Sequence, residues 1–204
     1  MKNIIKSLIF FALLFTILLI LNDIMQPQFP SKTFLENYTK ETPNSLDVLF
    51  IGDSAIYSDI SPLEMYNDYG FTSYDYSSPA ASNLLMYYMM LEALKTQTPK
   101  VIIMDSTNIF GQKEIESFTH QVTDFMPLDS TKWELINDSN YNFDLGEKIS
   151  ILFPFFRYHD GWSHMFGAVT TTNTTSTSSI YKGYLLNKNI QKATNQDDYM
   201  KDNL

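Results

Sequence analysis

Strand-like and helix-like segments alternate between residues 47 and 104, and this alternation constrains the fold of the chain more than any other feature. In chain order, the segments are a strand at Asp47–Ile51, a helix at Pro62–Tyr69, a strand at Thr72–Tyr76, a helix at Ser82–Thr96 and a strand at Val101–Met104. Such alternation is typical of a parallel sheet whose strands are joined by right-handed helical crossovers. We therefore predict an α/β fold with a doubly wound parallel sheet, and the last of these strands is apolar enough to lie in its middle.

The two helices of this region carry signals at their ends. Gly70 follows the first helix and can adopt the left-handed conformation that ends a helix. Ser82 precedes a run of apolar residues at helical spacing, and its hydroxyl can accept a hydrogen bond from an amide of the first turn. We expect the helices to stop and start at these two residues.

The amino-terminal segment Ile4–Met25 is almost continuously apolar, and its central part, Leu8–Leu21, holds a single polar residue, Thr16. At ~1.5 Å per residue the segment is about 33 Å long, which is enough to cross a bilayer. Lys2 and Lys6 precede the apolar centre and Asp23 follows it, so the positive-inside rule places the amino terminus in the cytoplasm. We expect a single-pass anchor in the cell membrane, with the remaining chain on the extracellular side.

A cleaved signal peptide is the rival interpretation of the same segment. The apolar stretch is long for a signal peptide, and Asn22–Pro27 contains no clear small-x-small cleavage pattern. We therefore favour an uncleaved transmembrane helix.

Composition restricts the chemistry that the chain can perform. The chain has no cysteine, so disulfides, thiolate catalysis and cysteine-ligated metals are excluded. Its 23 acidic and 14 basic residues give a formal net charge of -9, and Arg157 is the only arginine. A basic surface for nucleic acid is therefore not expected. We predict no cofactor, no bound metal and no nucleic-acid partner.

The chain divides into four parts by composition. Residues 1–25 are the predicted anchor, and residues 26–45, which mix Pro, Lys, Thr and Asn without periodicity, indicate a spacer. Residues 46–187 are the predicted α/β domain, and residues 188–204 are a polar tail.

The second half of the domain is less regular than the first. Met126–Leu128, Trp133–Ile136 and Leu145–Leu152 are interpreted as helical insertion elements. Thr170–Ser179 is a tract of Thr, Ser and Asn, and the chain becomes polar after it. We interpret the domain as incomplete at its carboxyl end, which predicts an exposed sheet edge.

A candidate nucleophile follows the first predicted strand. The tetrad Gly52–Ala55 comes directly after Val48–Ile51, and the glycine allows a sharp turn that places Ser54 at the carboxyl edge of the sheet. A turn cap is the competing interpretation, because Asp and Ser are ordinary turn residues. The loops at 77–80 and 105–108 follow the next two strands, so the parallel topology brings all three loops to one edge.

The chain resembles the SGNH or GDSL-like hydrolases, in particular their membrane-anchored Gram-positive surface members. The resemblance lies in Phe50–Ser54, Tyr74–Pro79, Thr98–Asp105 and Phe153–His159, and together these cover most of residues 46–184. It implies a flavodoxin-like three-layer fold.

The resemblance also implies roles for four residues. Ser54 is the nucleophile, and its backbone N–H helps to form the oxyanion hole. The backbone N–H of Ser77 stands where the family has a glycine, and Asn108 is the candidate side-chain donor. Asp53 shapes the nucleophile turn. Loop capping is the alternative role for Asn108.

The chain departs from the family at its carboxyl end, because it lacks the Asp-x-x-His pair that supplies the base and its orienting carboxylate. A serine hydroxyl is a weak nucleophile until a base takes its proton. The histidines are His120, His159 and His164. None has the family spacing, and we interpret all three as structural or surface residues.

The sequence is compatible with two functions. The first is a membrane-anchored extracytoplasmic esterase or O-acyltransferase that acts on acyl esters of cell-envelope polysaccharide or on small esters, and that is inactive if the missing pair is essential. The resemblance implies the membrane, and a membrane-bound O-acyltransferase beside it, as partners. The alternative is a non-catalytic surface binding or scaffold protein that retains the fold.

Overall fold

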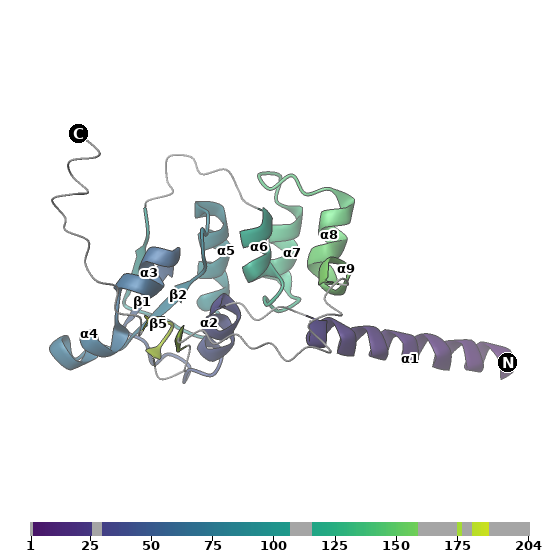
Figure 1. The fold of residues 1–204 in the computed structure, drawn as a ribbon, viewed down its shortest axis with the longest axis horizontal. Coiled ribbons are helices and arrows are strands. Elements are labelled where there is room, and N and C mark those ends of the chain that lie inside the picture. Colours follow the sequence, from purple (N-terminus) through teal and green to yellow (C-terminus); the bar gives the residue numbers. More distant parts are fainter. Residues whose placement is uncertain (1, 26–29, 107–115, 159–174, 177–180, 188–204) are drawn as a thin grey trace.

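The computed structural model describes residues 2–25, 30–106, 116–158, 175–176 and 181–187 (Figure 1). The helices are α1 (Lys2–Met25), α2 (Pro30–Tyr38), α3 (Ser54–Asp59), α4 (Pro62–Tyr69), α5 (Asn83–Ala93), α6 (Glu116–Thr123), α7 (Ser130–Asn137), α8 (Leu145–Leu152) and α9 (Phe155–Tyr158). The strands are β1 (Val48–Gly52), β2 (Ser73–Ser77), β3 (Val101–Met104), β4 (Thr175–Ser176) and β5 (Leu186–Asn187).

The described part of the domain is built on a small parallel sheet with strand order β2-β1-β3. Val48 is opposite Ser73 on one side and Val101 on the other. The prediction of a mixed α/β fold with a parallel sheet is therefore confirmed.

The predicted position of β3 in the middle of the sheet is wrong, because β1 is the central strand and β3 lies at the edge of the described sheet. Val101 is 49% exposed and Ile103 is 43% exposed. An apolar sequence therefore does not by itself identify a central strand. That this edge is the exposed one that the sequence predicts stays a prediction.

Helices lie on both faces of this sheet. Leu49 and Ile51 of β1 point into a buried cluster with Tyr74 and Tyr76 of β2. Residues of α2 and α5 complete this cluster, which includes Leu35, Leu85, Met86 and Met89. On the opposite face, α3 approaches Gly52, and α4 contacts β2 (Figure 1). A fully buried aliphatic side chain contributes about 1.5–3 kcal/mol, so this cluster is the main source of stability.

The signals at the helix ends act as predicted. The Ser61 hydroxyl caps α4, which has Pro62 in its first turn, and Gly70 ends the helix with a φ of 76°. The Ser82 hydroxyl accepts a hydrogen bond from the Leu85 amide at 3.1 Å and begins α5.

The segment interpreted as a spacer contains a packed helix instead. Phe34, Leu35 and Tyr38 of α2 are buried, and α2 contacts β2. The Tyr38 hydroxyl donates to the Ala93 carbonyl at 3.0 Å, and the Tyr74 hydroxyl donates to the Phe34 carbonyl at 2.7 Å. Residues 30–45 therefore belong to the domain.

The insertion helices are confirmed at α7 and α8. Asp129 caps α7, and Asp144 and Glu147 form a capping box at the start of α8. Met126–Leu128 is not helical and forms the bend between α6 and α7.

Residues 181–185, which we call the return segment, cover the outer edge of β2. The Asp75 amide donates to the Lys182 carbonyl at 2.9 Å, and the Leu185 amide donates to the Tyr57 carbonyl at 2.8 Å. This segment pairs some of the backbone N–H and C=O groups that an edge strand otherwise leaves open. The polar tail at 188–204 and most of the tract at 170–179 lie outside the described residues.

Helix α1 is long and apolar enough to cross a membrane, with a candidate span at Asn3–Leu21. The helix projects from one end of the domain (Figure 1). It contacts α9 near its own carboxyl end.

Candidate functional site

Backbone hydrogen bonds bring the loops after the three parallel strands together at one edge of the sheet. The Ser78 amide donates to the Gly52 carbonyl at 3.1 Å, and the Asp105 amide donates to the Ile51 carbonyl at 2.9 Å. The starts of the loops after β2 and β3 therefore lie beside the end of β1. Asn108, the third candidate oxyanion donor, lies outside the described residues.

Ser54 is the first residue of α3 and is exposed to solvent. Asp53 caps this helix, because its Oδ1 accepts a hydrogen bond from the Ala55 amide at 2.8 Å. Asp53 therefore holds the turn that carries Ser54, and the serine is accessible to a ligand from outside.

Gly52 is required by the close approach of α3 and β3. A Cβ atom at this position would lie 2.3 Å from Ile56 Cγ1 and 2.8 Å from Asp105 Cβ. Any side chain would push α3 or the loop after β3 away. The glycine of the motif therefore sets the position of the helix that begins with Ser54.

Ser77 is opposite Gly52 in the register and is fully buried. The Ser77 and Ser78 hydroxyls have no hydrogen-bond partner in the described part of the chain. The Ser78 amide already bonds to the Gly52 carbonyl. Ser77 is thus adjacent to the turn of Ser54 but is enclosed, whereas Ser54 is open.

Tyr57 is the neighbour that interacts with Ser54. Burial and the negative charge of Asp53 raise the pKa of Tyr57, and a hydrogen bond with Ser54 opposes this shift. The phenol is therefore protonated at neutral pH. In this state it is not the base that would activate the serine.

His120 belongs to a separate buried cluster. Its Nδ1 lies 3.2 Å from Asp124 Oδ1, and the Tyr158 hydroxyl donates to Asp124 Oδ2 at 2.7 Å. Burial and the charge of Asp124 raise the pKa of Tyr158. This cluster is formed by α6, the residue after it and α9. Helix α6 packs against α2, whereas α3 packs against β1 and β2. The placement fits the interpretation of His120 as a structural residue. His159 and His164 lie outside the described residues.

Asp75 was not identified as notable from the sequence. Its side chain is 0% exposed, and neither carboxyl oxygen has a hydrogen-bond partner among the residues that the structure describes. Burial raises the pKa of Asp75 to about 9. Ser73 and Ser77 share its face of β2, and the alternation of these polar residues with Tyr74 and Tyr76 is the sequence signal that could have indicated it.

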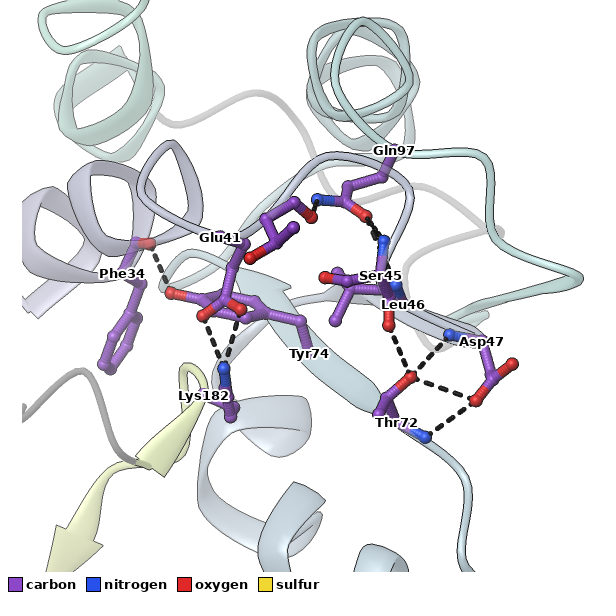
Figure 2. A network of polar contacts seen from close by, with 10 residues as sticks. Phe34, Glu41, Ser45, Leu46, Asp47, Thr72, Tyr74, Gln97 and Lys182 are labelled. Atoms are coloured by element: carbon purple, nitrogen blue, oxygen red, sulfur yellow. Dashed lines mark hydrogen bonds and ion pairs between the residues drawn. The ribbon is translucent and has the colours of Figure 1, made fainter.

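A polar network occupies the amino ends of the strands (Figure 2). Ser54 follows the carboxyl end of β1, so the network lies at the opposite end of the strand. Gln97 Oε1 accepts from the Ser45 amide at 2.9 Å, and Thr72 bonds to the Asp47 carboxylate at 3.0 Å. Hydrogen bonds from Lys100 and Thr72 hold the pKa of Asp47 at about 2. Lys182 pairs with Glu41 at 2.6 Å.

This network borders a cavity of about 350 Å³. Its lining includes Glu41, Leu63, Tyr66, Ser73 and Lys182. The cavity lies at the opposite end of the strands from Ser54, so it does not enclose the candidate nucleophile. Within the described ranges, no group of three or more His, Asp or Glu side chains is arranged to hold a metal ion.

Comparisons with known proteins do not identify a family. No family model matches the chain, and no curated protein or solved structure gives a significant match. The resemblance to the SGNH hydrolases therefore rests on the motifs alone.

Proposed function

We propose that the chain is a membrane-anchored serine esterase or O-acyltransferase of the SGNH type that acts on acyl esters of cell-envelope glycans outside the cytoplasmic membrane. The observation that carries this proposal is the exposed Ser54 at the carboxyl edge of a parallel sheet, on a turn held by Gly52 and Asp53. Ligand crevices of open α/β sheets lie at this edge. The apolar α1 supports membrane attachment.

In the proposed reaction, Ser54 Oγ attacks the carbonyl carbon of the ester and gives its proton to a base. The tetrahedral adduct then collapses, its bond to the alcohol oxygen breaks, and the alcohol leaves with the proton. Water or a glycan hydroxyl attacks the acyl-enzyme and restores Ser54. The oxyanion donors are the Ser54 and Ser77 amides and the Asn108 side chain, and one such donor is typically worth about 2.7–4 kcal/mol.

The base is the missing element of this proposal. Tyr57, three residues after Ser54 in α3, is protonated at neutral pH because burial and the charge of Asp53 raise its pKa. A base must therefore come from outside the described residues or from a partner such as a membrane-bound O-acyltransferase. This requirement makes the activation state of Ser54 the decisive measurement.

The test is covalent labelling of the full chain, in detergent micelles, with a fluorescent fluorophosphonate. Ser54 Oγ would attack the phosphorus and displace fluoride, which is efficient only for an activated serine. We expect labelling of the natural protein and at least a tenfold loss in Ser54→Ala. Ser58→Ala is the matched control, because Ser58 is an exposed serine of the same short helix, and this variant should label normally.

A non-catalytic binding or scaffold function is the second candidate, and the raised pKa of Tyr57, the titratable neighbour of Ser54, favours it because a protonated phenol cannot serve as the base. A folded sample that does not label would contradict the enzymatic proposal. If Ser54→Ala also bound acylated cell-envelope polysaccharide as well as the natural protein did, the binding function would replace it.

A further inference from the structure

An apolar stripe runs along the outer face of α8. Leu145, Ile149 and Phe153 are spaced by four residues, so they lie on one side of the helix. All three are exposed, whereas Ile151 of the same helix is fully buried. The helix therefore has one apolar face toward the core and another that the described residues leave open.

The stripe is part of a larger patch, which we call the α7–α9 patch. It consists of six residues that are between 39% and 74% exposed: Leu128, Trp133, Leu145, Ile149, Phe153 and Phe156. Isolated exposed apolar residues are normal, but a group of this kind marks a surface that contacts a membrane, another protein or a ligand.

The patch is continuous with the apolar surface of α1. A cavity of about 440 Å³ is lined by Phe15, Leu18 and Leu19 of α1 and, from the domain, by Leu152, Phe153 and Phe156 among others. Figure 1 shows α8 and α9 beside the carboxyl end of α1, at the end of the domain from which α1 projects. The domain therefore touches α1 within its candidate membrane span.

The position of this contact along α1 indicates how deep the contact would lie in the bilayer. The candidate span ends at Leu21. At ~1.5 Å per residue, Leu18 lies about 5 Å and Phe15 about 9 Å below that end. Interfacial helices bury their apolar faces to a depth of about 5–10 Å. Side chains of α9 that contact α1 at this height would lie in the same zone of the bilayer.

We propose that the α7–α9 patch rests in the outer leaflet of the membrane that α1 spans, so that the domain lies against the bilayer. This inference rests on the proposed membrane anchor and not on the proposed chemistry of Ser54. Trp133 suits the interface, where tryptophan is enriched. The two charged residues of α8 have partners within the domain: Glu147 accepts from the Asp144 amide at 2.7 Å, and Lys148 donates to Asn137 at 3.2 Å.

The test uses single cysteines in the full chain, which has none of its own. Ile149→Cys and Phe156→Cys carry an environment-sensitive fluorophore (NBD) in phosphatidylcholine vesicles. Tyr69→Cys on α4, which is exposed and lies at the other end of the domain, is the aqueous control. Leu14→Cys in α1 is the control for insertion. The quencher is phosphatidylcholine brominated near the headgroup end of its acyl chains.

We expect blue-shifted emission and at least twofold stronger lipid quenching at positions 149 and 156 than at position 69. A second measurement avoids changes within the patch: in Trp162→Phe, the remaining Trp133 should be quenched by the same lipid. The variant leaves Trp133 as the only tryptophan, because the chain has two.

Three results would overturn the inference. Water-like emission at positions 149 and 156, together with quenching at position 14, would show that α1 is inserted but that the patch does not contact the leaflet. Blue-shifted emission without lipid quenching would mean that a second copy or another protein covers the patch. The absence of quenching at position 14 would remove the anchor and this inference together. Fluorophosphonate labelling of Ser54 tests the chemistry independently of all three results.

Discussion

The Asp75→Asn variant is expected to be more stable than the natural protein at pH 8, and this advantage should shrink as the pH falls toward 5. Asp75 is completely buried in β2, and its carboxyl oxygens have no hydrogen-bond partner among the described residues. Ionising such a group without a compensating partner is costly, and burial accordingly raises its pKa to about 9. An amide of similar shape has no proton to lose.

The sign of the effect follows from proton binding. In the unfolded chain the carboxyl has a pKa of about 3.9, whereas in the folded protein its pKa is about 9. Between these values the folded state holds a proton that the unfolded state has lost. The contribution of the neutral acid is therefore fully present below pH 4 and is lost as the pH rises toward 9. The limiting slope is about 1.4 kcal/mol per pH unit.

The measurement is the free energy of unfolding in urea at pH 5, 6.5 and 8, with the full chain in detergent micelles. The difference between Asp75→Asn and the natural protein isolates Asp75 from the other titrating groups. The pKa of Asp47 is about 2, so its carboxylate stays ionised throughout this range. Asp68→Asn, which alters an exposed carboxylate of α4, should show the pH dependence of the natural protein. A constant difference between Asp75→Asn and the natural protein would mean that Asp75 does not bind a proton on folding.

Local signals predicted the elements of the sheet region well. The run Val48–Ile51 has a strong preference for a strand, and Ser82 and Gly70 mark helix ends through their own chemistry. These properties act over a few residues, so one sequence reveals them. The convergence of three loops near Ser54 followed from parallel topology, because strands joined by crossovers end at the same edge.

The errors concern contacts between distant segments. Val101–Met104 is apolar, but its position in the sheet depends on whether another strand pairs with it. The buried apolar residues of α2 are Phe34, Leu35 and Tyr38, and polar residues of the same helix are buried beside them, so no apolar pattern in the sequence indicates the helix. Asp75 is buried by the return segment, in which Gly183 lies against it. No local sequence pattern predicts this contact.

The Gly183→Ala substitution should detach this return segment from β2. Gly183 has a φ of +89°, which alanine adopts only with strain, and a Cβ atom would lie 2.1 Å from the Asp75 carbonyl oxygen. That oxygen belongs to the backbone of a buried strand and cannot move aside. We expect loss of the bonds from the Asp75 amide to the Lys182 carbonyl and from Lys182 to Glu41. We expect the free energy of unfolding to be lower than that of the natural protein by more than about 2 kcal/mol, because the substitution combines backbone strain with a clash.

The Gly70→Ala variant measures the cost of backbone strain without a steric clash, and is therefore the control for Gly183→Ala. Gly70 has a similar φ of +76°, but a Cβ atom there would have no heavy atom within 4 Å. This variant should lose only about 1–2 kcal/mol, the cost of the left-handed conformation for a residue other than glycine. Equal losses in the two variants would show that strain alone explains Gly183 and that the segment stays in place.

Limited trypsin digestion reports detachment directly. Lys182 is held by Glu41 through both carboxylate oxygens, at 2.8 and 2.6 Å, so cleavage after it should be slow in the natural protein and in Gly70→Ala. In Gly183→Ala the released segment opens locally, and cleavage at this site should be at least tenfold faster. Release would also admit water to Asp75 and lower its pKa. The pH dependence of stability in Gly183→Ala should therefore become as flat as that of Asp75→Asn, because the same packed segment excludes water from that carboxyl group.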